Sequence, residues 1–276
     1  MSGPHDVNFS RPFTALVLAA SRGPSDPVAE AEGRSHKCLV EVAGRPMLLR
    51  VLDALRASAS IGAVAVSIED AAVLESLPEV EPELSEGRLK VLRSAGSPSR
   101  SVLDAAGALE SPFPLLITTA DNPLLRPEVV EHFCTAARAS GAEVVAAVAA
   151  EEVIRGAAPD TRRTFLRFRD GRYSGCNLFA LAGPASLEAV RVWDQAGRHR
   201  KRPWRLVATF GPLSLLLFAL GRLTLDQAVA RAAAVMKTSA AAVRLPFGTA
   251  AIDVDKPSDL ALVRRILAAR EAQSST

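Results

Sequence analysis

FTALVLAA, residues 13–20, is the stretch of sequence that decides the fold. It is short and apolar, and a polar loop over residues 21–35 follows it, which is the pattern of a strand buried on both faces. The same pattern recurs at residues 63–68, 89–92, 114–119 and 142–149. Helical patterns alternate with it at residues 47–57, 71–77, 101–109 and 126–140, and a short extended piece is expected at 38–42. This alternation predicts a three-layer α/β/α fold with a mostly parallel, Rossmann-like sheet.

The second half of the chain departs from this alternation. Strand patterns at residues 164–168 and 173–181 flank Asp170-Gly171, a dipeptide typical of a two-residue β-hairpin turn. Further helices are expected at residues 184–193, 215–220, 224–235 and 259–272, and further strands at 243–245 and 250–254. The sequence contains no repeat and no low-complexity linker, so we expect a single domain over residues 1–276. Its halves are residues 13–150 and 151–276, with a helical insertion near 184–240.

The composition excludes several classes of protein. Among 276 residues, 33 Lys and Arg face 30 Asp and Glu, and a net charge of +3 does not predict nucleic-acid binding. An aromatic content of 5% leaves few side chains for base stacking. The three cysteines show no zinc or redox spacing, and residues 1–11 lack the apolar core of a secretion signal. The apolar run at 210–220 is too short to span a bilayer. We therefore expect a cytoplasmic protein that binds no nucleic acid.

Three acids follow apolar runs that are expected to be strands. Asp121 comes just after the run at 114–119, within TADNP, while Asp253 and Asp255 lie within AIDVDKP. Because the carboxyl ends of parallel strands share one edge of a sheet, acids at two such ends are expected to converge. Mg²⁺ is a hard cation that accepts a few carboxylates and keeps phosphate oxygens and water. Asp is equally common as a turn former or helix cap, so the residues alone leave both interpretations open.

The loop after the first strand is the second candidate site. The backbone N–H groups of this loop would bind phosphates at the end of the first strand, and Arg22 and Lys37 would add positive charge. Taken alone, this composition favours a solvated surface loop, because the sequence has no P-loop pattern. We interpret His36 as a surface residue, and Cys38 and Cys176 as thiols of the apolar core.

Several segments together resemble the MobA-like nucleotidyltransferases. LVLAASR at 16–22 and HKCLVEVAGRPML at 36–48 resemble the family's opening, which is an apolar strand, a glycine loop, K-x-L and G-x-P-[ML]. TADNP at 119–123 resembles its D-x-P metal motif, and NLF at 177–179 resembles its N-x-F segment. DVDKPSDL at 253–260 is similar to the D-[IV]-D-T-P-x-D-L ending. The matches come in family order and cover most of the chain.

The resemblance implies a nucleotide-diphospho-sugar transferase type of α/β/α fold. Residues 13–150 would bind the nucleotide, and residues 151–276 would bind the acceptor. The residues implied in nucleotide binding are Leu18, Ala19, Ala20, Ser21, Arg22, Lys37, Ser101 and Ala120. Ser101-Val102 resembles the start of a helix that helps to hold the base in cytidylyltransferase relatives, which gives a weak preference for CTP. A role of Ser101 as an ordinary helix N-cap is equally open.

The same resemblance implies the catalytic and acceptor residues. Lys37 would contact phosphates and stabilise the leaving pyrophosphate. Asp121 and Asp255 would hold Mg²⁺, with Asp253 as the substitute ligand, and Asn177 would lie beside the acceptor. These roles are implied by the family pattern and not by the spacing of the residues.

The first loop departs from the family pattern. Ala20 and Ser21 stand where relatives have paired glycines, Gly23 follows Arg22, and the loop to Lys37 is longer. The resemblance therefore leaves open the path of the phosphate-binding backbone and the role of Arg22.

Three functions remain in competition. The favoured one is transfer of a nucleoside monophosphate from an NTP to a small phosphorylated acceptor, namely a sugar, polyol or cofactor-precursor phosphate, with release of pyrophosphate. A glycosyltransferase on the same fold would need D-x-D near mid-chain, but the D-x-D of this sequence lies at 253–255. The third function is that of a regulatory relative that binds nucleotide without catalysis. The altered glycine loop keeps this alternative open.

The basic stretch RHRKRPWR at 198–205, followed by the apolar run at 210–220, is not explained by the basic fold. The favoured interpretation is a helical pair that packs on the sheet or forms a homodimer contact. A pocket for an anionic acceptor is the second. The third is peripheral membrane contact through residues 198–220, since a basic cluster beside an apolar helix binds anionic lipid.

Overall fold

The computed structural model describes the backbone of residues 9, 11–21, 26–198 and 212–274. Its strands are β1 (Phe13–Leu18), β2 (Glu41–Val42), β3 (Arg45–Pro46), β4 (Ile61–Ile68), β5 (Leu89–Arg93), β6 (Leu115–Thr119), β7 (Val144–Ala150), β8 (Leu166–Phe168), β9 (Gly171–Leu181) and β10 (Ala240–Arg244). Its α-helices are α1 (Pro27–Ala31), α2 (Met47–Arg56), α3 (Ala72–Glu75), α4 (Glu81–Ser85), α5 (Pro98–Ala108), α6 (Pro127–Ser140), α7 (Glu151–Ala157), α8 (Leu187–Arg198), α10 (Pro212–Ala219), α11 (Leu225–Met236) and α12 (Pro257–Ser274). The 3-10 turns are η1 (Lys37–Leu39), η2 (Pro184–Ser186) and η3 (Gly248–Ala251).

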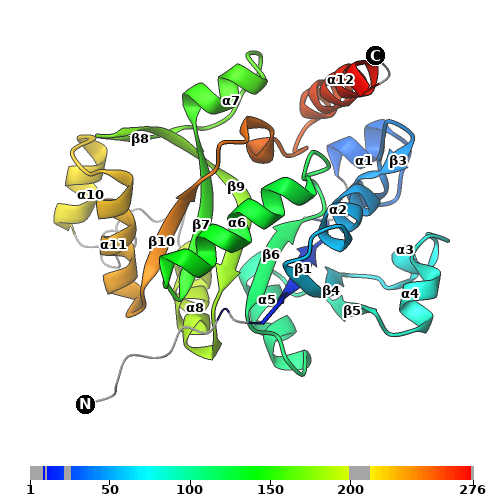
Figure 1. Ribbon diagram of the computed structural model, residues 1–276, viewed down its shortest axis with the longest axis horizontal. Helices are drawn as coiled ribbons and strands as arrows, with labels where there is room; N and C mark the ends of the chain where they lie inside the picture. Colours follow the sequence, from blue (N-terminus) through cyan, green and yellow to red (C-terminus); the bar gives the residue numbers. More distant parts are fainter. Residues whose placement is uncertain (1–8, 10, 22–25, 199–211, 275–276) are drawn as a thin grey trace.

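One large sheet runs through the centre of the molecule (Figure 1). Its strand order is β10-β7-β9-β6-β1-β4-β5, and β8 pairs with β9 beside this path. β1 is parallel to both of its neighbours, so Leu16 pairs with Ala65 of β4 and with Ile117 of β6. β9 is antiparallel and lies between β6 and β7. The expectation of a mostly parallel sheet is confirmed.

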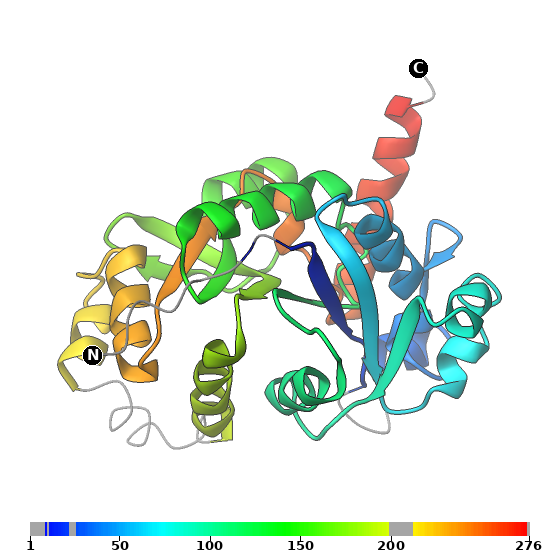
Figure 2. The ribbon, with the colours of Figure 1, turned by 60° about the horizontal axis from the view of Figure 1, so that its bottom comes forward.

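The apolar character of residues 13–20 follows from burial on both faces of the sheet. Successive side chains of a strand point to opposite faces. Val17 lies in one apolar cluster with Leu52 of α2 and Phe133 of α6. Its neighbour Leu16 lies in another cluster with Val102 of α5. Figure 2 shows α5 and α8 on one side of the sheet and α6 on the other, so the three-layer α/β/α fold is confirmed.

The other expected helices and strands are confirmed with shifts at their ends, apart from two segments. The strand expected at 250–254 is wrong, because this part of the chain begins with the 3-10 turn η3. Gly248 of η3 packs so closely on α7 that a Cβ there would lie 2.2 Å from the carbonyl oxygen of Val153. Helix α7 was not expected either, since it follows β7 directly without a side-chain cap. The division into residues 13–150 and 151–276 stays a prediction.

The extended piece expected at 38–42 is correct only for its last residues. The turn η1 precedes β2, and β2 pairs with β3 in a small antiparallel ribbon. Ala43 and Gly44 connect these strands with φ angles of 49° and 69°. A two-residue turn with positive φ at both positions suits a tight hairpin. This ribbon leads the chain from η1 into α2.

The β8–β9 hairpin is confirmed, but its turn lies one residue earlier than expected. Phe168 pairs with Gly171, so Arg169 and Asp170 are the turn residues. The carboxylate of Asp170 accepts a hydrogen bond of 2.9 Å from the backbone N–H of Leu225, the first residue of α11. The acid of the turn therefore also ties the hairpin to the helical part of the second half.

Gly248→Ala tests the close contact between η3 and α7. The added Cβ meets backbone and not a flexible side chain, so we expect the free energy of unfolding to fall by about 2 kcal/mol. Gly107→Ala in α5 is the matched control, because a Cβ there meets nothing within 4 Å, and it should raise stability by about 0.5–1 kcal/mol. Urea denaturation measures both. Equal stability of the two variants would contradict the packing described.

Candidate functional site

The candidate site lies where the order of the strands changes direction. From β1 the chain first builds β4 and β5 on one side and then returns to place β6 on the other side. Ligands of open α/β sheets bind at the carboxyl ends of the strands beside such a point. The backbone N–H of Ala120 donates to the carbonyl of Leu18 at 3.0 Å, so the ends of β1 and β6 lie together. Ala19 and Ala120, which directly follow these two strand ends, are buried.

Lys37 lies at the centre of this site. Its Nζ donates to Oδ2 of Asp121 at 2.5 Å and to the carbonyl oxygen of Val254 at 3.0 Å. Oδ1 of Asp255 is 3.7 Å away. The side chains of Lys37 and Asp121 are only 15% and 13% exposed, whereas that of Asp255 is 42% exposed. One ammonium group therefore joins the two acids that the sequence predicts to be metal ligands.

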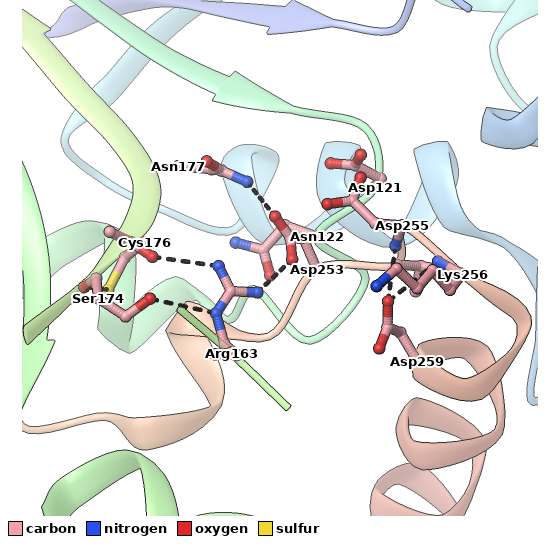
Figure 3. A network of polar contacts seen from close by, with 12 residues as sticks. Asp121, Asn122, Arg163, Ser174, Cys176, Asn177, Asp253, Asp255, Lys256 and Asp259 are labelled. Carbon is pink, nitrogen blue, oxygen red and sulfur yellow. Dashed lines mark hydrogen bonds and ion pairs between the residues drawn. The ribbon is translucent and has the colours of Figure 1, made fainter. Parts of the chain in front are cut away.

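The segment before α12 is tied to the end of β6. The backbone N–H of Val254 donates to the carbonyl of Asp121 at 2.9 Å. The N–H groups of Asp255 and Lys256 donate to Oδ2 of Asp259 at the start of α12, as Figure 3 shows. Oδ1 of Asp255 lies 3.7 Å from Nζ of Lys37, so the loop places this carboxylate beside the lysine.

Asp253 has a different environment from Asp255. Its carboxylate pairs with the guanidinium of Arg163 and accepts a hydrogen bond of 2.6 Å from Nδ2 of Asn177 (Figure 3). Arg163 also donates to Oγ of Ser174 at 3.3 Å. Asn177 adopts the left-handed region with φ 50°. Asp253 therefore links β9 to the segment before α12, and the predicted acceptor residue Asn177 lies next to the acids.

Burial and charge act against each other on these groups. Burial alone lowers the pKa of Lys37, but Asp121 and Asp255 outweigh it and the net pKa is raised. Lys37 is therefore held in its charged form. Burial raises the pKa of Asp253, and its acidic neighbours Asp121 and Asp255 raise it further, although Arg163 lowers it. Burial and the neighbouring acids thus act together on Asp253 and oppose the effect of Arg163.

Four buried side-chain oxygens at or just after the end of β6 are left without a partner among the described residues, and two of them, Oγ1 of Thr118 and Oγ1 of Thr119, belong to the strand itself. Oδ1 of Asp121 and Oδ1 of Asn122 are buried and accept no hydrogen bond. An unsatisfied buried acceptor costs about 1–3 kcal/mol, so such an atom marks a place where a cation or donor fits. The described residues form no cluster of three or more His, Cys, Asp or Glu side chains placed to hold a metal ion. Two carboxylates fit Mg²⁺ when phosphate oxygens and water complete its shell.

The loop after β1 carries an acid that the sequence analysis missed. Glu69, directly after β4, accepts hydrogen bonds from the backbone N–H of Ser21 at 3.1 and 3.2 Å. His36 Nε2 lies 3.6 Å from the same carboxylate. Arg22, predicted to bind the nucleotide, lies outside the described residues. Glu69 could have been found by the argument used for Asp121, since both follow a buried strand. No pattern in the sequence marked Arg163 as a residue of the site.

The two interpretations of Ser101 are now separated. Ser97 caps α5 by accepting from the backbone N–H of Arg100 at 3.2 Å, so Ser101 as N-cap is wrong. Ser101 is buried and its Oγ accepts from the backbone N–H of Ala95 at 2.8 Å. It thereby shapes the loop between β5 and α5. Its role in holding a base stays a prediction.

The three cysteines belong to the core, as expected for two of them. Cys38, Cys134 and Cys176 are all buried. Burial raises the pKa of each thiol to about 12. A thiol with such a pKa is protonated near neutral pH and is a poor nucleophile, so these residues have a packing role.

The basic stretch is only partly visible, because residues 199–211 lie outside the described part of the chain. Leu216 of helix α10 is 56% exposed, and Leu220, which directly follows the helix, is 58% exposed. Among the described helices, none has the length and apolar character needed to cross a bilayer. The homodimer contact and the peripheral membrane contact both stay predictions.

The acids and the lysine lie at the switch point of a mostly parallel sheet, which is where open α/β proteins bind a ligand. A model of the MobA-like NTP transferase domain matches residues 15–204, and the chain belongs to this family. The resemblance of the sequence motifs to MobA-like nucleotidyltransferases is thereby confirmed.

Individual relatives agree with this assignment. A hypothetical transferase from Thermus thermophilus has a solved structure that superposes with a TM-score of 0.75 at 31% identity, covering 91% of this chain and 99% of that one. The bifunctional protein GlmU of Anaeromyxobacter dehalogenans is 36% identical over 52% of this chain but only 29% of its own length. The 2-C-methyl-D-erythritol 4-phosphate cytidylyltransferase of Frankia casuarinae is 27% identical over 71% of this chain and 73% of its own.

Lys37→Met tests the buried ion pair. Without the ammonium group Asp121 is left buried and uncompensated, so we expect the free energy of unfolding to fall by about 3 kcal/mol. Adding Asp121→Asn should recover most of this loss, because the buried charge is then removed. Lys90→Met, at an exposed position of β5, is the control and should change stability by less than about 0.5 kcal/mol. Chemical denaturation measures all four proteins, and a harmless Lys37→Met would contradict the pairing.

Proposed function

We propose that the protein transfers a nucleoside monophosphate from an NTP, with CTP preferred, to a small phosphorylated acceptor and releases pyrophosphate. The acceptor class is a sugar, polyol or cofactor-precursor phosphate. One observation carries the proposal, which is the placement of Lys37 between Asp121 and Asp255 at the switch point of the sheet. Membership in the MobA-like NTP transferase family supports it.

Asp121 and Asp255 would hold Mg²⁺, because Asp121 presents a buried carboxylate oxygen without a partner among the described residues and Asp255 is partly exposed beside it. When bound, Mg²⁺ neutralises charge on the α-phosphate. Asp253 is the weaker candidate ligand, since Arg163 and Asn177 already occupy its two oxygens.

Lys37 would stabilise the negative charge that develops on the pyrophosphate. Its raised pKa keeps the ammonium group charged at neutral pH. Once a nucleotide supplies phosphate oxygens, the ammonium group can exchange its contact with Asp121 for one with phosphate. The acceptor's own phosphate is the nucleophile, so orientation supplies most of the rate and no covalent intermediate on the protein is needed.

The preference for CTP rests on two observations. The Frankia relative is named as a cytidylyltransferase and matches 71% of this chain. Ser101-Val102 stands at the position of the base-holding helix in the family pattern, and Ser101 fixes the loop before α5 through Ala95. The exposed Ala20 and the partly exposed Ser21 would lie beside the nucleotide.

Glu69 favours a second candidate function, a regulatory relative that binds nucleotide without turnover. Its carboxylate occupies the backbone N–H of Ser21, which a phosphate would otherwise use. A triphosphate must therefore displace Glu69 or follow a different path. A glycosyltransferase activity receives no comparable support, because Asp253 is paired with Arg163.

Asp121→Asn tests the transferase assignment. With Mg²⁺, each of the four NTPs and a panel of sugar 1-phosphates and polyol phosphates, we expect pyrophosphate release to be fastest with CTP. Asp121→Asn should lower kcat by about 10²–10³-fold, and Asp104→Asn at an exposed position of α5 should not. Full activity of Asp121→Asn would contradict the metal assignment. No pyrophosphate release with any combination would favour the regulatory relative.

Asn177→Gly tests the acceptor side of the site. Glycine tolerates the positive φ of this position, so the variant removes the amide without backbone strain. We expect the KM for the acceptor to rise by about tenfold and the KM for the NTP to stay unchanged. Lys237→Gly is the matched control, because Lys237 also has positive φ, at 52°, and ends α11. An equal rise of both KM values would contradict the assignment.

A further inference from the structure

A chain of three polar side chains, Arg163, Asp253 and Asn177, connects β9 to the segment before α12 (Figure 3). Nη1 of Arg163 donates to one carboxylate oxygen of Asp253, and Nδ2 of Asn177 donates to the other at 2.6 Å. Arg163 also donates to Oγ of Ser174 at 3.3 Å and to the carbonyl of Gly175 at 3.5 Å, so it is anchored on β9. The carboxylate therefore has a fixed place between a guanidinium group and an amide.

The orientation of the Asn177 amide follows from the chemistry of its partner. A carboxylate that pairs with a guanidinium group accepts hydrogen bonds and donates none. Asn177 must therefore turn its amide nitrogen, and not its amide oxygen, toward Asp253, and the contact of 2.6 Å holds it there. The amide oxygen Oδ1 consequently lies on the side of the amide that faces away from Asp253.

This amide oxygen is open to a ligand. In the described part of the chain, the side chain of Asn177 makes one hydrogen bond, which is the one that Nδ2 donates to Asp253. Asn177 is partly exposed, although the residues on both sides of it are buried. An amide oxygen accepts hydrogen bonds and donates none, so its complement is an O–H or N–H group. A phosphate dianion, which offers acceptors only, does not fit this oxygen.

A bulge in β9 aims the side chain of Asn177 at this place. The register of the β7–β9 pairs shifts between Ala146 and Val148, so that three residues of β9, 176–178, lie opposite one residue of β7. Asn177 is the middle one of the three and has φ 50°. The β6–β9 pairs stop before the bulge, which therefore lies beside the end of β6 and the acid that follows it. Bulges beside active sites often redirect a side chain.

We propose that Oδ1 of Asn177 accepts a hydrogen bond from a hydroxyl group of the acceptor, and that Arg163 and Asp253 are positioning residues that hold the amide in this orientation. This role, which rests on the proposed function, narrows the acceptor to a phosphorylated sugar or polyol with a free hydroxyl group at this place. A phosphorylated cofactor precursor that lacks such a hydroxyl group is a poor substrate.

Deoxy analogues of the acceptor test the role of the amide oxygen. Pyrophosphate release is measured with the best acceptor of the panel and with analogues that each lack one hydroxyl group. The hydroxyl ratio is the kcat/KM of the acceptor divided by that of its analogue. For at least one analogue we expect a ratio of about ten or more in the wild type, because Oδ1 of Asn177 loses its donor. In Asn177→Gly the same ratio should fall to about one.

The hydroxyl ratio separates recognition from a merely structural role. A structural disturbance lowers the activity with the acceptor and with its analogue alike, and it leaves the ratio unchanged. An unchanged ratio in Asn177→Gly for every analogue would therefore overturn the proposal.

Three variants test the positioning residues. Asp253→Asn offers donors as well as acceptors, so the amide of Asn177 can turn either way and the hydroxyl ratio should fall. Arg163→Gln should lower the ratio too, whereas Arg163→Lys keeps a positive charge beside Asp253 and should retain more of it. Arg162→Gln is the matched control, because it removes the exposed arginine next in sequence and should leave the ratio as in the wild type.

Nuclear magnetic resonance of the side-chain amides gives a readout that does not need catalysis. The Nδ2 signal of Asn177 is assigned by its absence in Asn177→Gly. Its hydrogens should exchange with solvent at least about tenfold faster in Asp253→Asn and Arg163→Gln than in the wild type. The signal should shift with a sugar or polyol phosphate of the panel and not with the matching deoxy analogue. Equal exchange in all these proteins, or a signal that shifts with no member of the panel, would contradict the proposal.

The two measurements also separate this role from the proposed function. If no combination of substrates releases pyrophosphate but the amide signal of Asn177 still responds to the hydroxyl group, only the proposed function is lost. If pyrophosphate is released and the hydroxyl ratio does not depend on Asn177, only the role of the amide oxygen is lost.

Discussion

The contact of Lys37 with Asp121 and with the carbonyl of Val254 is the interaction on which the candidate site depends. It joins three segments that are distant in sequence, namely the turn after the first loop, the end of β6, and the loop before α12. Because Lys37 and Asp121 are mostly buried, each charge needs the other when no ligand is present. The same contact brings Asp255 within 3.7 Å of the ammonium group. The ion pair thus keeps the acid that follows β6 and the acid of the loop before α12 close together.

The central sheet and its acids were predictable for a common physical reason. Strands buried on both faces must be apolar throughout, so residues 13–20 and 114–119 stand out in the sequence. The carboxyl ends of parallel strands share one edge, so an acid just after such a run, as at Asp121, is expected to face a ligand. The same reasoning would have found Glu69 after β4. Irregular packing was not predictable in this way. The 3-10 turn η3 packs against α7 through Gly248, and no periodicity in the sequence marks that contact.

The parts of the site that the sequence did not reveal depend on contacts across long distances in the chain. Arg163 meets Asp253 at a separation of 90 residues, and no local pattern marks that pair. This contact distinguishes the two acids of D-V-D, because Asp253 pairs with Arg163 whereas Asp255 lies beside Lys37, and the difference favours Asp255 as the proposed metal ligand. The charged partners of Asp253 and Asp255 are therefore determined by contacts in the folded chain, and the D-V-D motif alone does not reveal them.

The most direct test of this account is the position of a divalent cation in crystals grown with CTP and Mn²⁺. Anomalous scattering from Mn²⁺ locates the ion without reference to the protein density. We predict a single strong peak about 2.1 Å from Oδ1 of Asp121, with a carboxylate oxygen of Asp255 and an α-phosphate oxygen as further ligands. Lys37 should then lie against phosphate. A bound nucleotide whose cation contacts neither Asp121 nor Asp255 would contradict the account.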